Sequence, residues 1–184
     1  MRVIVGICGA SGVSYAKLLL EELKKRKIET HVITSDWAKK ILQYELPEAK
    51  IEELANYLYN NNNLAAEISS TSFVTDAMVI LPATVKTVSD IANAHVDNLI
   101  ARCADNMLRQ HKKLIVCIRE TPLSAPTLKN LYKLALYGAI VFPLSPAFYH
   151  KPTTIEEMQS FIVGKILDLL SIENNLFKRW KNEL

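Results

Sequence analysis

Short, continuous apolar runs alternate along this chain with segments whose apolar residues recur every three or four positions. The runs are rich in Val, Ile and Leu, which is typical of strands buried on both faces of a sheet. They predict strands at Val3–Cys8, Thr30–Thr34, Ala77–Leu81, Leu114–Ile118 and Ala139–Phe142. The segments between them predict helices at Val13–Lys25, Trp37–Tyr44, Ile51–Tyr59, Val85–Ala94, Val96–Gln110, Thr127–Tyr137 and Ile155–Leu170.

Repeated β-α-β units imply a parallel sheet with right-handed crossovers. We therefore predict an α/β fold: a three-layer, Rossmann-like or flavodoxin-like domain with a parallel sheet flanked by helices. In such sheets, ligands bind beyond the carboxyl ends of the strands. The loops at those ends are Gly9–Gly12, Ser35–Asp36, Pro82–Thr87, Arg119–Pro122 and Pro143–His150, whereas Asn60–Asn63 is a polar turn without evident chemistry.

The length of 184 residues suits a single domain with a full core. We expect one domain over 1–184, in which 173–184 form a polar tail. Phe177 and Trp180 favour docking of this tail on the site or on a neighbouring subunit. The net charge of +3, with no basic run interleaved with aromatic residues, argues against nucleic-acid binding. No stretch approaches the roughly 20 apolar residues of a membrane span.

The three cysteines, Cys8, Cys103 and Cys117, are far apart in the sequence. They form no C-x-x-C pair and no plausible zinc set with the four histidines, so we expect no metal site. Cys8 and Cys117 stand in apolar runs and are expected in the core. An odd number of cysteines without a disulfide framework fits a reducing compartment, the cytoplasm. The first apolar run is too short for a signal peptide.

Three of the five glycines, Gly6, Gly9 and Gly12, fall within seven residues after the first apolar run. A strand that enters a glycine-rich turn before a helix brings unpaired backbone N–H groups beside a loop without side-chain bulk. A phosphate or a nucleotide can lie there. The spacing G-x-x-G-x-x-G is neither the dinucleotide fingerprint nor a Walker A loop. A purely structural turn stays an alternative.

Two further loops carry polar chemistry. We expect Pro82 to end its strand, after which the hydroxyls of Thr84 and Thr87 suit a phosphate or the polar edge of a flavin. The alternative is that this segment only caps a helix and that Lys86 is a solvated side chain. Arg119 can hold an anion and Glu120 can exchange a proton, unless the two form only a surface ion pair.

The loop from 143 to 152 holds three prolines and two aromatic residues, which suit the wall of a flat ligand or the packing of a crossover. Its His150 alone is more often structural than catalytic. Glu45 and Lys165 stand in predicted helices, where the pattern indicates solvated charges.

Together these segments resemble the UbiX/Pad family of flavin prenyltransferases, in the flavin-dependent homo-oligomeric cysteine decarboxylase superfamily. The matching stretches follow the family's order and span nearly the whole chain. They are Gly6–Gly12 (GICGASG), Ile28–Ser35 (IETHVITS), Ile68–Phe73 (ISSTSF), Met78–Thr87 (MVILPATVKT), Val116–Leu123 (VCIRETPL), Pro146–Pro152 (PAFYHKP) and Leu176–Trp180 (LFKRW).

The resemblance implies an enzyme that joins a dimethylallyl group, donated by dimethylallyl monophosphate, to N5 and then to C6 of reduced FMN. The product, prenylated FMN, would serve a partner decarboxylase of the UbiD type. No metal is expected, and phosphate is released. The resemblance also implies trimers that are commonly built into homododecamers, with the site between subunits.

Position by position, the resemblance gives three overlapping sets of site residues. FMN is expected on Gly9, Ala10, Ser11, Ser35, Thr84, Val85, Lys86, Thr87 and Arg119. The prenyl phosphate is expected on Arg109, Tyr149 and Lys165, with Trp180 closing over the site. The catalytic residues are expected to be Ser11, Glu45 and Glu120. Either Glu120 or the departing phosphate would accept the C6 proton.

Three residues depart from the family pattern. Cys8 stands where Ser or Thr is common, Arg109 where lysine is frequent and Lys165 where arginine is frequent. The last two keep their positive charge, so these exchanges bear on donor affinity more than on the type of reaction.

Two other functions stay open. A cysteine-type decarboxylase of the same superfamily would need an early histidine and a P-x-M-N-x-x-M-W block, and the sequence has no such block. A non-enzymatic FMN-binding carrier would use the glycine turn equally well. A carrier would not need the cations Arg109, Arg119 and Lys165 together with Glu120.

Overall fold

The computed structural model describes residues 1–180. The chain divides into two compact units, Met1–Pro143 and Leu144–Leu184. The last four residues of the expected tail, 181–184, lie outside the described residues. The single domain expected over 1–184 stays a prediction.

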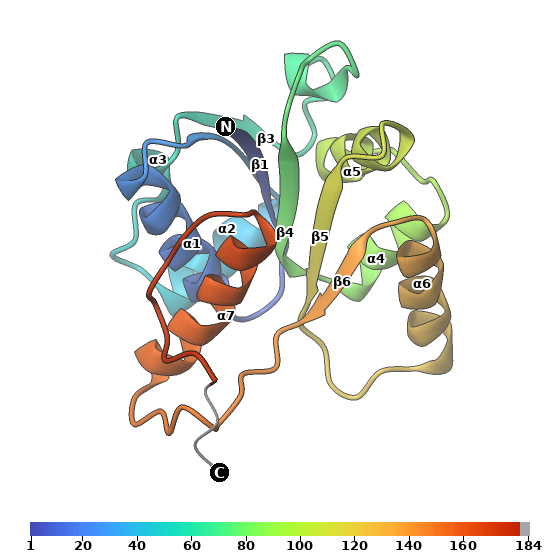
Figure 1. The fold of residues 1–184 in the computed structure, drawn as a ribbon. Helices are drawn as coiled ribbons and strands as arrows, with labels where there is room; N and C mark the ends of the chain where they lie inside the picture. Colours follow the sequence, from blue (N-terminus) through green and yellow to red (C-terminus); the bar gives the residue numbers. More distant parts are fainter. Residues whose placement is uncertain (181–184) are drawn as a thin grey trace. The chain divides into compact units, whose positions relative to one another are not determined.

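The first unit is built on a six-stranded parallel sheet with the order β3-β2-β1-β4-β5-β6 (Figure 1). This order reverses at the β1/β4 boundary, as in the doubly wound nucleotide-binding folds. The predicted α/β class with a parallel sheet is thereby confirmed. The strands are β1 (Arg2–Ile7), β2 (Glu29–Thr34), β3 (Tyr57–Asn60), β4 (Ala77–Ala83), β5 (Lys113–Ile118) and β6 (Ile140–Pro143).

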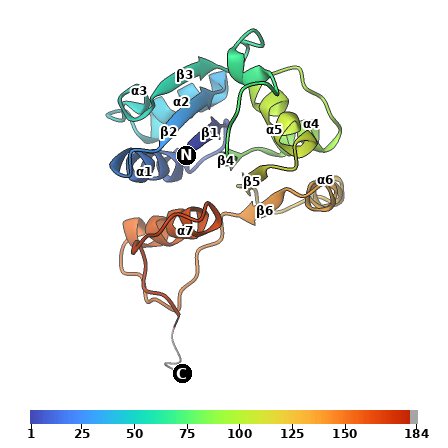
Figure 2. The same cartoon turned by 45° about the horizontal axis from the view of Figure 1, so that its top comes forward.

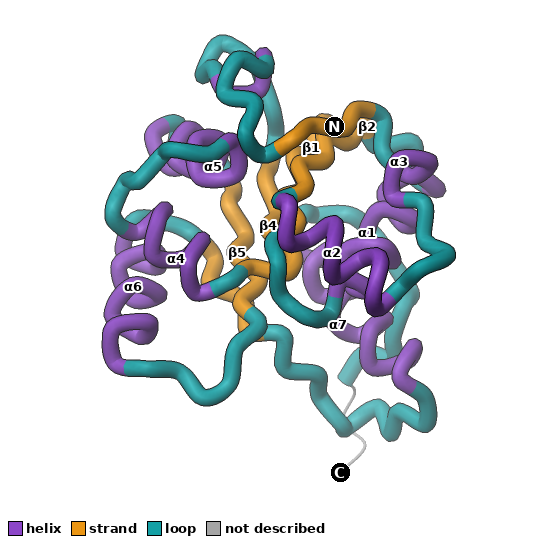
Figure 3. Tube along the Cα trace, turned by 180° about the vertical axis from the view of Figure 1, so that it is seen from behind, coloured by secondary structure: helices purple, strands orange, loops and turns teal. Residues whose placement is uncertain are grey.

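The helices of this unit form two groups. One group, with β1 to β3, contains α1 (Val13–Lys25), α2 (Asp36–Glu45) and α3 (Ile51–Leu54). The other, with β4 to β6, contains α4 (Val85–Ala92), α5 (Leu99–Arg109) and α6 (Ala125–Leu136). Figure 2 shows the two groups beside the two halves of the sheet, and Figure 3 shows the strands running between them. None of the helices within residues 1–180 is long and apolar enough to span a membrane.

The core of the first unit is centred on β4, because helices from both groups cover this strand. All seven residues of β4 are buried, and β4 contacts α1 as well as α5. On the α5 side, Met78 and Ile80 of β4 join Ile100 of α5 and Leu114 of β5 in one apolar cluster. This double coverage explains why β4 has a continuous apolar sequence instead of an alternating one.

Two local predictions are wrong. The helix predicted over Ile51–Tyr59 ends at Leu54, and Tyr57–Asn60 form the edge strand β3. This strand is short and mostly exposed, so it carries neither a continuous apolar run nor strict alternation. Pro82 does not end its strand, because β4 continues to Ala83 through a register shift against β5. The shift accommodates a residue that has no backbone N–H to donate.

Backbone hydrogen bonds continue the parallel ladder one residue past four of the strands. Cys8 N–H donates to Pro82 O (3.1 Å), and Ser35 N–H donates to Ile7 O (3.1 Å). Asn61 N–H donates to Thr34 O (3.4 Å). Arg119 N–H donates to Ala83 O (3.2 Å). The first loop residue after each of these strands is therefore fixed at the carboxyl edge of the sheet.

The second unit consists of α7 (Ile155–Leu169) and the segments that flank it. The described part of the tail folds back onto this helix. The buried Asn174 donates to Gly164 O (3.1 Å) and to Asp168 Oδ1 (2.9 Å), and Arg179 pairs with Asp168 through two hydrogen bonds. Gly164 leaves room for Phe177, because a Cβ at Gly164 would lie 2.5 Å from Phe177 Cδ1.

Gly164→Ala is therefore expected to release the tail from α7, although alanine normally stabilises a helix interior by about 1 kcal/mol relative to glycine. Tryptic cleavage at Lys178 and Arg179 should accelerate in this variant, as measured by mass spectrometry of the native protein under limited digestion. The double variant Gly164→Ala/Phe177→Ala removes the clash with the ring, while the close contact of the new Cβ with Asn174 Oδ1 (2.9 Å) remains. If Gly164→Ala alone leaves the cleavage rate unchanged, the packing of the tail on α7 is refuted.

Candidate functional site

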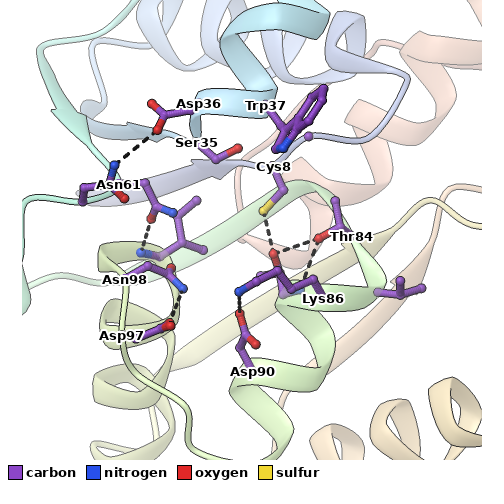
Figure 4. A pocket seen from close by; sticks show the side chains of 15 residues that line it. Cys8, Ser35, Asp36, Trp37, Asn61, Thr84, Lys86, Asp90, Asp97 and Asn98 are labelled. Atoms are coloured by element: carbon purple, nitrogen blue, oxygen red, sulfur yellow. Dashed lines mark hydrogen bonds and ion pairs between the residues drawn. The ribbon is translucent and has the colours of Figure 1, made fainter.

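A pocket of about 430 Å³ lies at the carboxyl edge of the sheet, at its topological switch point (Figure 4). Its volume is in the range of small-molecule sites. The lining comes from the loops after β1, β2, β3 and β4 and from the starts of α2, α4 and α5. These residues are Cys8, Gly9, Ser35, Asp36, Trp37, Asn61, Asn62, Thr84, Val85, Lys86, Thr87, Asp90, Asp97, Asn98 and Ile100.

The glycine turn is shaped by close backbone packing. A Cβ at Gly9 would lie 2.3 Å from the Cβ of Trp37, so only glycine fits between β1 and the first turn of α2. Gly12 adopts a left-handed conformation (φ 93°) as the residue before α1. Its N–H donates to Glu45 Oε2 (2.9 Å), at the end of α2. Glu45, which the pattern alone assigned to solvent, thus holds the glycine turn in place.

Three helices begin at this pocket, and each has a side-chain cap. Ser35 Oγ accepts from Ala38 N–H at the start of α2, and Thr84 Oγ1 accepts from Thr87 N–H at the start of α4. Asn98 Oδ1 accepts from Ala101 N–H at the start of α5. The partial positive charges of these N-termini favour an anionic group in the pocket.

Cys8 and the two threonines form a hydrogen-bonded row along one wall (Figure 4). The Thr87 hydroxyl donates to Cys8 Sγ (3.2 Å) and lies 3.0 Å from Thr84 Oγ1. Burial raises the pKa of the Cys8 thiol to about 11, which the bond from Thr87 only partly offsets. Cys8 is therefore a neutral hydrogen-bonding residue of the pocket wall, and its expected place in the core is confirmed.

The charged side chains around the pocket are mainly acidic. Lys86, which was expected to bind FMN, is paired with Asp90 (2.6 Å). The hydrogen bond that Lys86 donates to Asp90 is the main cause that raises the pKa of Lys86, so this residue stays protonated. Asp36 and Asp97 also line the pocket. An anion bound here would rely on backbone dipoles and neutral donors as well as on Lys86.

The sequence pattern missed the contribution of the loop after β3. Asn61 and Asn62, which were assigned to a turn without evident chemistry, both line the pocket. Asn62 Nδ2 donates to Asp36 Oδ2 (3.2 Å), and Asn61 accepts from two N–H groups of α5. The site loops were selected as those that follow predicted strands. The segment before Asn61 was predicted as a helix, so this loop was not among them.

The structure gathers part of the expected site in this pocket. Gly9, Ser35 and Thr84 to Thr87 line it, whereas Ala10 is buried and Ser11 is exposed in the glycine turn beside it. Arg119 follows β5, and its backbone is bonded to Ala83, the neighbour of Thr84. Glu120 is exposed, and its carboxylate accepts from Thr121 N–H (3.1 Å).

Arg109 lies elsewhere in the first unit. It is the last residue of α5, about 15 Å along the helix from its first residue, Leu99, which follows Asn98 at the pocket. There it lies 3.6 Å from Asp105 and lines a second pocket with Lys133 and Tyr137. One chain therefore does not bring Arg109 to the pocket at the glycine turn.

Tyr149, Lys165 and Trp180 belong to the second unit. The rings of Tyr149 and Trp180 meet edge to face, with their centroids 5.2 Å apart. Tyr149 also contacts Phe161 of α7, while Lys165 is exposed on the same helix. The structure thus brings an expected phosphate ligand and the expected closing aromatic together.

The family model described as Flavoprotein matches residues 1–167. The chain is also 46% identical to flavin prenyltransferase UbiX of Methanocaldococcus jannaschii over 182 residues, with 98% of each chain covered. The chain belongs to the flavoprotein family, among the UbiX flavin prenyltransferases.

Solved structures of UbiX-type flavoproteins share the whole fold. AnUbiX (PadA1), crystallised with FMN and dimethylallyl pyrophosphate, matches with a TM-score of 0.96 at 37% identity, covering 98% of this chain and 97% of that one. A dodecameric FMN-dependent UbiX-like decarboxylase from Escherichia coli O157:H7 matches with a TM-score of 0.96 at 36% identity, covering 99% and 100%. The resemblance found in the sequence motifs is confirmed.

The raised thiol pKa predicts a steep pH dependence for alkylation of Cys8 in this flavoprotein. At pH 8, a pKa of about 11 leaves about one thiol in a thousand as thiolate. The rate of reaction with iodoacetamide, followed on the Cys8 peptide by mass spectrometry, should rise about tenfold per pH unit from pH 8 to pH 10. Protein unfolded in urea is the control, and equal rates for folded and unfolded protein at pH 8 would contradict the prediction.

Proposed function

We propose that this protein is a flavin prenyltransferase that transfers a dimethylallyl group from dimethylallyl monophosphate to N5 and C6 of reduced FMN. The observation that carries the proposal is a pocket at the switch point of a doubly wound sheet, lined by the glycine turn and three capped helix N-termini. The 46% identity to a flavin prenyltransferase over 98% of the chain supports it. The product would serve a UbiD-type decarboxylase. The three cysteines are free and buried, in keeping with the expected reducing cytoplasm.

The residues present fit a flavin mononucleotide. Gly9 lines the pocket with bare backbone, since a side chain there would clash with Trp37, and the hydroxyls of Ser35, Thr84 and Thr87 supply neutral donors next to helix N-termini. Gly9 to Ser11 and Arg119 complete the proposed contacts. Bound reduced FMN supplies the nucleophilic nitrogen and carbon, and the protein holds and shields it.

The donor phosphate requires cations, because it departs as a dianion. We propose Arg109, Tyr149 and Lys165 as its ligands, with Trp180 covering the site. Since Arg109 lies about 15 Å along α5 from its own pocket, it would act in the site of a neighbouring subunit. A homododecamer built from trimers supplies that neighbour. The dodecameric relative supports this assembly.

Proton transfer is assigned to the carboxylates. Glu120 is the candidate acceptor of the C6 proton, although the departing phosphate could accept it instead. Glu45 would act through its bond to Gly12, which positions Ser11 in the glycine turn. Aromatic side chains around the donor would exclude water without offering a competing nucleophile.

The decisive experiment is an anaerobic incubation of the protein with chemically reduced FMN and dimethylallyl monophosphate, followed by mass spectrometry of the released flavin. A flavin heavier by one dimethylallyl unit is the expected result. The carrier function would be favoured if FMN copurifies with the protein but stays unmodified when either dimethylallyl monophosphate or dimethylallyl diphosphate is the donor.

Glu120→Gln and Arg119→Ala are each expected to lower turnover at least about 100-fold, because each removes a charge proposed to contact the reacting molecules. Single-turnover formation of the heavier flavin measures the effect. Glu156→Gln and Lys129→Ala are charge-matched controls at exposed positions elsewhere, and they should retain wild-type turnover. Full turnover in both test variants would refute the site assignment.

Subunit sharing predicts complementation between two inactive variants. Gly9→Ala forces Trp37 and the first turn of α2 away from β1 and so distorts the pocket, whereas Arg109→Ala leaves the pocket intact and removes the cation. If Arg109 serves a neighbouring pocket, equal mixing with reassembly should restore roughly a quarter of wild-type activity, since half of the pockets and half of the arginines are intact. Size-exclusion chromatography controls for assembly. A mixture as inactive as its components would contradict the shared site.

A further inference from the structure

We propose that Asn61 binds the phosphate group of FMN through its side-chain Nδ2, and so fixes the nucleotide end of the flavin. This inference rests on the proposed function, because it concerns the same pocket. It assigns a role to the loop after β3, which neither the sequence motifs nor the expected site residues include.

The orientation of the Asn61 carboxamide is set by α5. Asn61 Oδ1 accepts from Ile100 N–H (2.8 Å), and Asn61 O accepts from Leu99 N–H (2.7 Å). Backbone N–H groups only donate, so the oxygen of the carboxamide must face α5. The Nδ2 group carries two protons and has no hydrogen-bond partner among residues 1–180. Asn61 lines the pocket, so this donor is available to a ligand there (Figure 4).

The surroundings of Asn61 favour an anionic oxygen as the ligand atom. The N-termini of α2, α4 and α5 border the same pocket, and Asn61 accepts from two N–H groups in the first turn of α5, next to the cap residue Asn98. The neighbouring Asn62 donates to Asp36, and Lys86 is paired with Asp90. Because Asp90 partly neutralises Lys86, a phosphate in this pocket needs further donors. Asn61 Nδ2 supplies one, since the Oδ1 atom of the same carboxamide already accepts from Ile100 N–H.

Asn61→Asp separates this role from the hydrogen bond that Asn61 accepts from α5. The aspartate keeps an oxygen for Ile100 N–H, and its charge suits a helix N-terminus, so the unfolding midpoint in urea should not fall. The same charge removes the donor and repels a phosphate. The Kd for FMN, measured by quenching of flavin fluorescence, should rise tenfold or more. Asn61→Ala should weaken FMN binding and also lower the unfolding midpoint.

Riboflavin, which lacks the phosphate, is the matched ligand, and Asn63→Asp is the matched variant. Asn63 is exposed in the same loop and does not line the pocket. The Kd of riboflavin should change less than twofold in Asn61→Asp, and Asn63→Asp should leave both affinities unchanged.

The inference is overturned if Asn61→Asp binds FMN as tightly as the wild type does, or if it loses FMN and riboflavin equally. Failure of the wild-type protein to bind FMN would instead overturn the proposed function and this role with it. Because affinity and unfolding are measured on the same variants without turnover, the two failures are distinguishable.

Discussion

The parallel hydrogen-bond ladder of the sheet extends one residue beyond its strands, and the arrangement of the site depends on this extension. The residues held in this way, Cys8, Ser35, Asn61 and Arg119, all belong to loops at or beside the pocket. Each backbone is fixed by a hydrogen bond to the neighbouring strand, and the side chains of Cys8, Ser35 and Asn61 make separate hydrogen bonds within the site. A loop anchored in this way can present polar groups precisely without apolar packing of its own.

The same edge gathers charges of opposite kinds. Three helix N-termini bring partial positive charge, whereas Asp36, Asp90 and Asp97 bring negative charge. The dipoles fall off within one turn, while the carboxylates are partly solvated or paired. An anion close to the helix N-termini is therefore favoured over one farther out, beside the carboxylates.

The fold could be predicted from sequence largely because nearly every residue of β1, β4 and β5 is buried, so these strands carry continuous apolar runs. β3 could not, because an exposed four-residue edge strand has no core to impose a pattern on Tyr57 to Asn60. Because β3 was not predicted, the contribution of the following residue, Asn61, to the pocket was not predicted either. The role of Glu45 could not be derived from helical periodicity either, because its contact with Gly12 joins residues 33 positions apart. The motif resemblance supplied Glu45, Arg109 and Lys165, whose helical positions alone indicated nothing.

Both edges of the sheet are formed by short strands, β3 and β6, of four residues each. Each offers too few free backbone groups to template a long added strand, and β6 ends in Pro143. Copies of this chain are therefore poorly suited to joining their sheets edge to edge into a continuous ribbon. An assembly of defined size must instead meet through side chains of helices and loops, where shape complementarity limits the number of copies.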